Sequence, residues 1–232
     1  MADPKNDPTA DREWLVNQIA HALRNPIFAA SVQTEALQLR AADPEAVVKT
    51  AESLHGQLQR LSDSIDEMLL FGRPVRSELE EVAVAELVAT VVGRYRNGDR
   101  QEPAELSADA VEPGLSGRWN RDLLTVILER MLDNAVQHTE PPHRIRLSVV
   151  RTGSDTIEFV VRDQGAGIPS DILDKVKLPF FPQHSGRPGL GLAIADKFAR
   201  CLGGRIEIES EEGSGTVARC VLPLRADAAD RR

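Results

Sequence analysis

The sequence predicts an α+β protein in two parts: a helical hairpin that forms a dimeric four-helix bundle, then an α/β sandwich with a mixed sheet and helices on one face. Three observations predict it: apolar residues recur at coiled-coil spacing in the first third, strand-like runs alternate with turn residues further on, and helical stretches lie between those runs. The expected boundaries are a disordered segment over residues 1–10, the hairpin over 11–72, a linker over 73–80, the sandwich domain over 81–225 and a disordered tail over 226–232.

The composition limits the class of protein. Of the 232 residues only 4% are aromatic, so the cores must be built from Leu, Val, Ile and Ala. The net charge of −8, without a dense basic block, argues against a nucleic-acid-binding protein. No apolar run approaches the ~20 residues of a membrane-spanning helix, and the polar N-terminus is unlike a signal peptide. Cys201 and Cys220 match no metal-site spacing and indicate buried thiols in a reducing compartment. We therefore expect a cytoplasmic chain without membrane contact, either complete or the soluble part of a longer protein.

The first third of the chain predicts two helices. A helical pattern covers residues 11–40 with Pro26 as its interruption, and Asp43-Pro44 is typical of the start of a second helix. The second helix carries an a/d-type apolar seam made of Val47, Ala51, Leu54, Leu58, Leu61, Ile65 and Met68. Because a hairpin cannot bury so long a stripe alone, we expect a homodimer. The alternative is that both helices pack onto the rest of the chain.

The remainder of the chain mixes helical and strand patterns. Helices are predicted over residues 84–95, 120–138 and 189–202, and strands over 145–150, 156–162, 205–209 and 216–222. The turn sequence Thr152-Gly153-Ser154-Asp155 predicts a hairpin between the first two of these strands.

Three polar or glycine-rich motifs occur in order in this second part. Asn134 lies on a predicted helix, Asp163-Gln164-Gly165-Ala166-Gly167 follows a strand, and Gly189-Leu190-Gly191 precedes a later helix. A P-loop is excluded, because no Gly-x-x-x-x-Gly-Lys-Ser/Thr sequence is present. A dinucleotide fingerprint is also excluded, because Pro169 follows the glycine pair and no third glycine opens a helix.

The first helix contains His21 in the sequence His21-Ala22-Leu23-Arg24-Asn25-Pro26. A proline five residues downstream of the histidine kinks a helix and frees backbone groups. The other histidines, which lack such a setting, are His55, His138, His143 and His184. His138 follows Asn134 at a helical i+4 step, so it could line the same pocket.

In this order, the motifs resemble the catalytic core of the sensor histidine kinases of two-component systems. The resemblance covers nearly the whole chain and implies a histidine-phosphotransfer hairpin followed by an ATP-binding domain of the fold shared with DNA gyrase. It implies ATP-dependent autophosphorylation of His21, with Arg24 meeting the transferred phosphate. Asn25 matches the residue that orients a water for dephosphorylation of the partner. The implied partner is a response-regulator receiver domain, whose aspartate receives the phosphoryl group.

The resemblance also assigns the adenine and metal contacts. Asp163 matches the carboxylate that accepts a hydrogen bond from the adenine amino group, and Gly165 and Gly167 match the turn that approaches the base. Asn134 matches the ligand of Mg²⁺, whose other positions are filled by phosphates and water. His138 is placed with these residues as a candidate nucleotide contact.

The phosphate contacts follow in the same way. Gly189, Leu190 and Gly191 match the loop and helix N-terminus whose N–H groups hold phosphate oxygens. The segment 170–188 resembles the mobile lid over the nucleotide, with Pro179-Phe180-Phe181 as its phenylalanine-containing box.

Several positions depart from the family pattern. Ala22 replaces the acidic residue that normally follows the histidine, Arg130 replaces an asparagine, and Gln137 replaces a basic residue. The lid reads Pro182-Gln183-His184 where Thr-Thr-Lys is usual. Two alternatives to a kinase therefore stay open: a degenerate kinase that acts as a response-regulator phosphatase or dimerising regulator, and a non-enzymatic interaction module.

Overall fold

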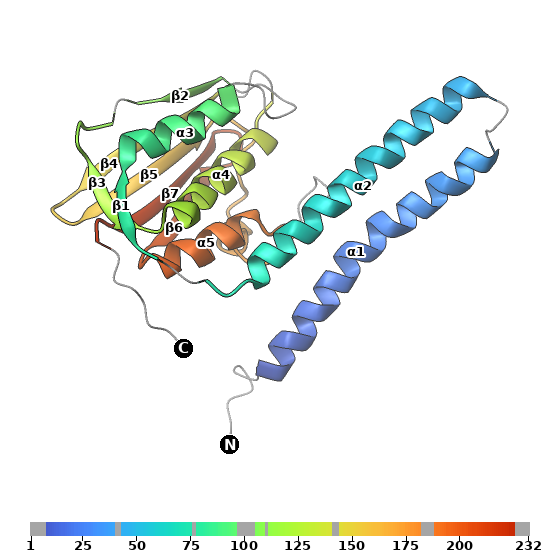
Figure 1. Ribbon diagram of the computed structural model, residues 1–232, viewed down its shortest axis with the longest axis horizontal. Coiled ribbons are helices and arrows are strands. Elements are labelled where there is room, and N and C mark those ends of the chain that lie inside the picture. The colour runs from blue at the N-terminus through green and yellow to red at the C-terminus, as the bar shows by residue number, and fades with distance from the viewer. Residues whose placement is uncertain are drawn as a thin grey trace. The chain divides into compact units, whose positions relative to one another are not determined.

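A computed structural model describes residues 8–39, 43–75, 78–96, 105–109, 111–140, 144–181 and 188–225 (Figure 1). The chain forms two compact units, one built on Met1–Gly72 and the other on Arg73–Phe181 with Gly189–Arg232. The predicted disorder of residues 1–7 and 226–232 lies outside the described residues. In the described part of the chain, no helix combines the length and the apolar character needed to cross a membrane.

The first unit is the predicted antiparallel hairpin of α1 (Pro8–Leu39) and α2 (Pro44–Gly72) (Figure 1). α1 begins three residues earlier than expected, because proline is accepted in the first turn of a helix, and it continues through Pro26. The predicted start of α2 is confirmed: Asp43 Oδ1 accepts hydrogen bonds from the backbone N–H groups of Glu45 and Ala46, each at 3.2 Å.

The apolar repeat of α2 divides into two stripes. The half-buried stripe consists of Val47, Leu54, Leu61 and Met68, and the exposed stripe of Ala51, Leu58 and Ile65. Leu58 is 50% exposed and Ile65 is 40% exposed. α1 packs against α2, and Gln33 Nε2 donates to Ser53 Oγ at 2.9 Å between them. The hairpin therefore buries only one half of its own seam.

The second unit is built on a five-stranded sheet in the order β2-β4-β5-β7-β6. Its strands are β2 (Leu106–Ala108), β4 (Ile145–Thr152), β5 (Thr156–Asp163), β6 (Arg205–Glu211) and β7 (Gly215–Pro223). β2 and β4 are parallel and the other pairs are antiparallel, which confirms the predicted mixed sheet. A separate antiparallel pair joins β1 (Glu80–Ala83) to β3 (Ser116–Trp119).

Three helices, α3 (Val84–Arg96), α4 (Arg121–Gln137) and α5 (Gly191–Cys201), cover one face of this sheet (Figure 1). Residues of β5 alternate accordingly: Ile157, Phe159 and Val161 are buried beneath the helices, while Arg162 is exposed on the opposite face. Asn120 caps α4, since its Oδ1 accepts from the N–H of Leu123 at 2.9 Å. The predicted sandwich with helices on one face is confirmed.

The short strands β1, β2 and β3 were not expected, because segments of three or four residues carry too little alternation to be recognised. The predicted start of the last helix at Gly189 is wrong. α5 begins at Gly191 because Gly189 has φ +69°, outside the helical region.

Trp119 joins the small sheet to the large one. It is fully buried, its ring meets Phe159 edge to face at a centroid distance of 6.3 Å, and its Nε1 donates to the carbonyl of Pro223 at 2.7 Å. A Cβ on Gly117 would lie 2.1 Å from the indole ring, so glycine there leaves room for it. Truncating a buried tryptophan to alanine costs about 3–5 kcal/mol, so this contact is a main tie between β3, β5 and β7.

Candidate functional site

Asp163, the last residue of β5, is the centre of the candidate site. The residue is 6% exposed on the helix-covered side of the sheet. Its Oδ1 accepts two backbone hydrogen bonds, from Gly165 at 2.9 Å and from Thr216 at 3.1 Å. No hydrogen bond to Oδ2 is found within the described residues. The carboxylate is therefore fixed through one oxygen and keeps the other as an acceptor.

The charge of this carboxylate is set by opposing effects. Burial raises the pKa of Asp163 above its ordinary value, and this is the largest effect. The two backbone hydrogen bonds and the positive charge of His138 lower the pKa and offset part of the rise.

The turn after Asp163 packs backbone against backbone. A Cβ on Gly165 would lie 2.1 Å from the carbonyl oxygen of His138, and a Cβ on Gly167 would lie 2.0 Å from that of Glu211. Gly167 also has φ +70°, a region that favours glycine. The carbonyl of His138 accepts the N–H of Ala166 at 3.3 Å. The two glycines thus allow the turn to lie directly on the end of α4 and on the β6–β7 connection.

The β6–β7 connection holds the same turn from the other side. The carbonyl of Ala166 accepts a hydrogen bond from the N–H of Gly213 at 2.7 Å, and Ser210 Oγ accepts one from the N–H of Ile168 at 2.9 Å. Thr216 and Ser210 were not expected in the site, although the sequence around Gly213 matches the end of the family pattern. Their roles depend on strand pairing between distant residues, so no local motif reveals them.

α5 presents an N-terminus without a side-chain cap. Leu190 is its N-cap residue and makes no side-chain cap hydrogen bond, and the first turn contains no acidic residue. A Cβ on Gly191 would meet nothing within 4 Å, so the space in front of it is open. A Cβ on Gly189 would lie 2.2 Å from the carbonyl oxygen of Phe181, and its φ of +69° also requires glycine. Free N–H groups at the start of an 11-residue helix favour an anion.

The last two turns of α4 carry polar side chains that face this region. Asn134 and Gln137 share one side of the helix, since they are three residues apart. The side-chain amide of Asn134 is half-buried and makes no hydrogen bond within the described residues. Gln137 Nε2 is buried and has no hydrogen-bond partner in the part of the chain that the structure describes. A buried unsatisfied donor costs about 1–3 kcal/mol, and an anionic oxygen placed there would remove that cost.

Arg130 lies one turn before Asn134 on the same helix. Its Nη1 is 3.6 Å from Asp133 Oδ2, and Asp133 Oδ1 also accepts from the hydroxyl of Tyr95 at 2.7 Å. Arg130 is therefore paired with Asp133, which Tyr95 of α3 holds in place.

The structure brings Gly165 against the carbonyl of His138 and Gly167 against that of Glu211, and Asp163 is hydrogen-bonded to Gly165 in the same turn. Gly189, Leu190 and Gly191 stand at the start of α5, which packs against α4. No group of three His, Cys, Asp or Glu side chains that could hold a metal ion is found among the described residues. The polar groups present are side-chain amides and the N–H groups of a helix N-terminus. The N–H groups suit an anion, and an amide oxygen suits the hard cation that accompanies it.

His21, Arg24 and Asn25 lie together on α1 in the first unit. Their spacing of three and four residues places them on one side of the helix, and all three side chains are exposed. Pro26 has no N–H group, so the carbonyl of Ala22 receives no helical hydrogen bond. Ala22 is half-buried, and no carboxylate directly follows His21.

Only the first part of the expected lid is described. Residues 182–187, including Gln183 and His184, lie outside the described residues. Among the described residues other than glycine, only Phe180 has a positive φ, of +59°. A bulky residue in this conformation is a strained one.

Two families match the chain. Residues 11–75 match the His Kinase A (phospho-acceptor) domain, and residues 119–226 match the histidine kinase-, DNA gyrase B- and HSP90-like ATPase domain. Among curated relatives, the Sensor-like histidine kinase SenX3 of Mycolicibacterium smegmatis is 29% identical over 228 residues, 94% of this chain and 59% of that protein. The Sensor protein QseC of Escherichia coli K12 is 27% identical over 207 residues, 86% of this chain and 45% of that protein.

Solved structures agree with the fold. The crystal structure of histidine kinase ThkA in complex with response regulator protein TrrA superimposes with a TM-score of 0.77 at 22% identity, over 93% of this chain and 62% of that one.

The chain spans 55–59% of the length of the SenX3 relatives that it matches.

The raised pKa of Asp163 leads to a prediction about pH-dependent stability. The pKa of Asp163 is higher in the folded state than in the unfolded state. The protonated carboxyl group therefore contributes stability that is complete below the unfolded-state pKa and is lost as the pH rises through the folded-state pKa. Asp163→Asn keeps an oxygen acceptor for Gly165 and Thr216 but cannot ionise. We expect its melting temperature to rise relative to the wild type between acidic and neutral pH. Circular dichroism melts from pH 3 to 7 measure this, with the exposed Asp171→Asn as control. If the melting temperature of the wild type increased relative to that of the variant as the pH rises, the assignment would be contradicted.

Proposed function

Since the chain belongs to the sensor histidine kinases, with a phospho-acceptor domain followed by a kinase-type ATPase domain, we propose that it uses ATP to phosphorylate itself on His21. The phosphoryl group then passes to an aspartate on a response-regulator receiver domain. The observation that carries the proposal is the exposed group of His21, Arg24 and Asn25 on the helix that matches the phospho-acceptor domain.

Asp163 and its glycine turn are proposed to bind the adenine. Asp163 Oδ2 remains available to accept from an exocyclic amino group, because both backbone hydrogen bonds go to Oδ1. The absence of side chains at Gly165 and Gly167 lets a flat base approach the backbone. His138 lies beside this turn and is proposed as a further nucleotide contact.

The start of α5 and the end of α4 are proposed to bind the phosphates. The N–H groups at Gly189, Leu190 and Gly191 supply donors without charge, and the orphaned Gln137 Nε2 supplies another. The side-chain oxygen of Asn134, Oδ1, is proposed as the protein ligand of Mg²⁺. The ion, when bound, neutralises charge on the phosphates and so assists phosphoryl transfer.

His21 is proposed to act as the nucleophile through a neutral imidazole nitrogen. A nitrogen–phosphorus bond forms as the bond from the γ-phosphorus to the ADP oxygen breaks. Arg24, one helical turn away, is placed to meet the charge of the transferred group. Asn25 is proposed to orient a water when the partner is dephosphorylated. With alanine at position 22, no adjacent carboxylate takes the imidazole proton, so we expect slow autophosphorylation.

The exposed stripe of α2 supports a homodimer. Further exposed apolar side chains on the hairpin are Trp14, Val16, Ile27, Phe28, Val32, Leu39, Val48 and Leu69. So much exposed apolar surface is typical of an association surface. A second hairpin that covers it completes a four-helix bundle.

A receiver domain is proposed as the second partner. The similar protein ThkA was crystallised with a response regulator protein, TrrA. We place the activity in the cytoplasm, where ATP is available and where the free thiols of Cys201 and Cys220 stay reduced.

Replacement of His21 tests the phosphorylation site. We expect His21→Gln to abolish the incorporation of label from γ-labelled ATP, because the only histidine of α1 is lost. His55→Gln removes an exposed histidine from α2 and serves as the matched control, with label retained. Ala22→Glu restores a carboxylate and should raise the rate by up to about 10²–10⁴-fold. Label on His21→Gln equal to that on the wild type would disprove the assignment. Label on Ala22→Glu alone would favour a regulator that has lost kinase activity.

Replacement of Gly165 tests the nucleotide site. Gly165→Ala places a methyl group against the carbonyl of His138 and must displace the turn. We expect the affinity for a non-hydrolysable ATP analogue with Mg²⁺ to fall by roughly tenfold or more, about 1.4 kcal/mol. Gly93→Ala is the control, because its added methyl meets nothing within 4 Å on α3. Calorimetric titration of both variants measures the difference, and equal affinities would contradict the site.

Charge placed in the exposed stripe tests the homodimer. The double variant Leu58→Glu, Ile65→Glu should be monomeric in sedimentation experiments, because dimerisation would bury four carboxylates in an apolar seam. Glutamate suits a helix, so the hairpin should keep its helical circular dichroism. Leu178→Glu changes an exposed leucine of the other unit, 54% exposed, and should leave the dimer intact. A wild type that sediments as a monomer would refute the dimer.

A further inference from the structure

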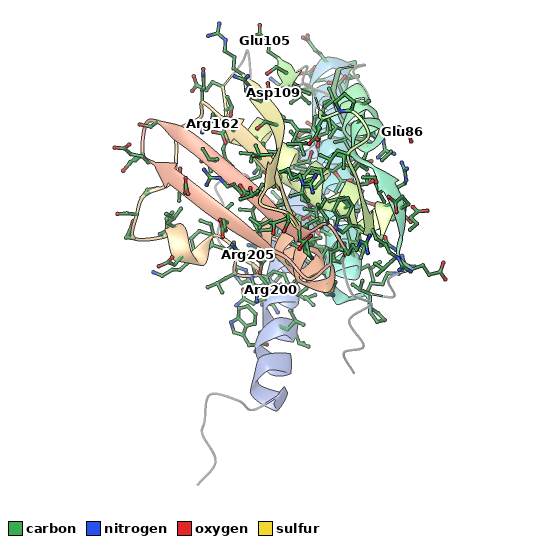
Figure 2. The ribbon with its side chains drawn as sticks, turned by 90° about the vertical axis from the view of Figure 1, so that its left-hand side faces the viewer. Glu86, Glu105, Asp109, Arg162, Arg200 and Arg205 are labelled. Carbon is green, nitrogen blue, oxygen red and sulfur yellow. The ribbon has the colours of Figure 1, made fainter. Side chains whose placement is uncertain are left out.

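A surface pocket of about 620 Å³ opens where β2, β4 and β5 meet, and neither the nucleotide nor the histidine chemistry uses it. Arg144, Arg146 and Arg162 line it against a single carboxylate, Glu105. Figure 2 shows Arg162, Glu105 and Asp109 on the same side of the domain. The chain has 36 acidic residues and 28 lysines and arginines, so this excess of positive charge around the pocket is opposite to the net charge of the whole chain.

Two of these arginines stand directly opposite each other. Arg146 on β4 pairs in register with Arg162 on β5, and both project from the face of the sheet that carries no helices. Like charges directly opposite on neighbouring strands destabilise a sheet. The fold therefore keeps a repulsive pair at a position where an acidic residue would be favourable.

The neighbouring carboxylates orient the guanidinium groups without neutralising all of them. Asp109 Oδ1 accepts from Arg146 Nε at 2.9 Å and from Arg146 Nη2 at 2.7 Å. Glu105 Oε2 lies 3.4 Å from Arg144 Nε. Arg162 has neither a hydrogen bond nor an ion pair within the described residues. The pocket thus contains two positioned arginines and a third whose charge is not compensated.

We propose that this pocket binds a phosphate dianion, free or as the phosphoryl group of a small phosphomonoester, between Arg146 and Arg162. Guanidinium groups present paired N–H donors that match phosphate oxygens, and charge-assisted hydrogen bonds of this kind are strong. Gln164, which also lines the pocket, supplies an uncharged donor. A bound dianion turns the repulsion between the two arginines into a shared attraction.

The phosphate pocket is separate from the proposed nucleotide site. Side chains alternate along β5, so Asp163 is buried on the helix-covered face while Arg162 is exposed on the other. The pocket goes beyond the proposed function, and its occupancy requires neither ATP nor His21.

Calorimetric titration of the full chain with inorganic phosphate and with glycerol 3-phosphate, without Mg²⁺, tests the proposal. We expect saturable binding by the wild type and at least a tenfold loss of affinity in Arg162→Gln. Arg205→Gln is the matched control, because Arg205 lies on the same open face at the other edge strand and outside the pocket, paired with Glu207. Binding of both probes indicates a phosphomonoester site, and binding of inorganic phosphate alone indicates a site for the free anion.

Three results would overturn the proposal. They are no saturable binding by the wild type, equal losses in Arg162→Gln and Arg205→Gln, and loss of phosphate binding in Gln137→Ala, which would assign the anion to the proposed phosphate contacts at the end of α4. Removal of one of two like charges should also raise the melting temperature of Arg162→Gln in phosphate-free buffer. A lower melting temperature would contradict the like-charge argument.

Discussion

The two backbone hydrogen bonds on Asp163 Oδ1 are the interaction on which the ATP-binding domain depends. One donor, Gly165, belongs to the turn after β5, and the other, Thr216, belongs to β7. The carboxylate therefore ties a strand, a turn and a neighbouring strand at one point while its second oxygen stays available. Burial makes the charged form costly, and the two N–H groups offset part of that cost. The residue that we propose to recognise the base is thus also one whose ionisation works against folding.

Close approach of backbone to backbone is the second constraint on the site. At Gly165, Gly167 and Gly189 an added Cβ would lie 2.0–2.2 Å from a carbonyl oxygen of another segment. Gly165 and Gly167 each join two pieces of chain that are distant in sequence, and Gly189 lies against Phe181 eight residues before it. The resulting cradle is built largely of peptide groups around the carboxylate of Asp163.

Features with a local signal could be predicted from the sequence, and features made by distant contacts could not. The Asp43 cap, the seam of α2, the β4–β5 hairpin and the Asp163 turn each depend on residues close in sequence. The β1–β3 pair, the three-residue strand β2 and the contact of Trp119 with Pro223 depend on residues 33 to 104 positions apart. Thr216 was missed for the same reason, since its N–H reaches Asp163 only through the register of β5 and β7. The start of α5 was misplaced because a positive φ at Gly189 leaves no periodic signal.

The strand order has a consequence for synthesis on the ribosome. β7 is the last strand of the sheet in sequence, yet it lies between β5 and β6. Until it emerges, β5 has an open edge, β6 has no neighbour in the sheet, and Asp163 lacks the N–H of Thr216. The ATP-binding domain consequently cannot close its nucleotide cradle progressively from the N-terminal side. An emerging chain holds β5 with one unpaired edge until β7 inserts, and that exposed edge is the point at which nascent copies are most prone to pair with one another.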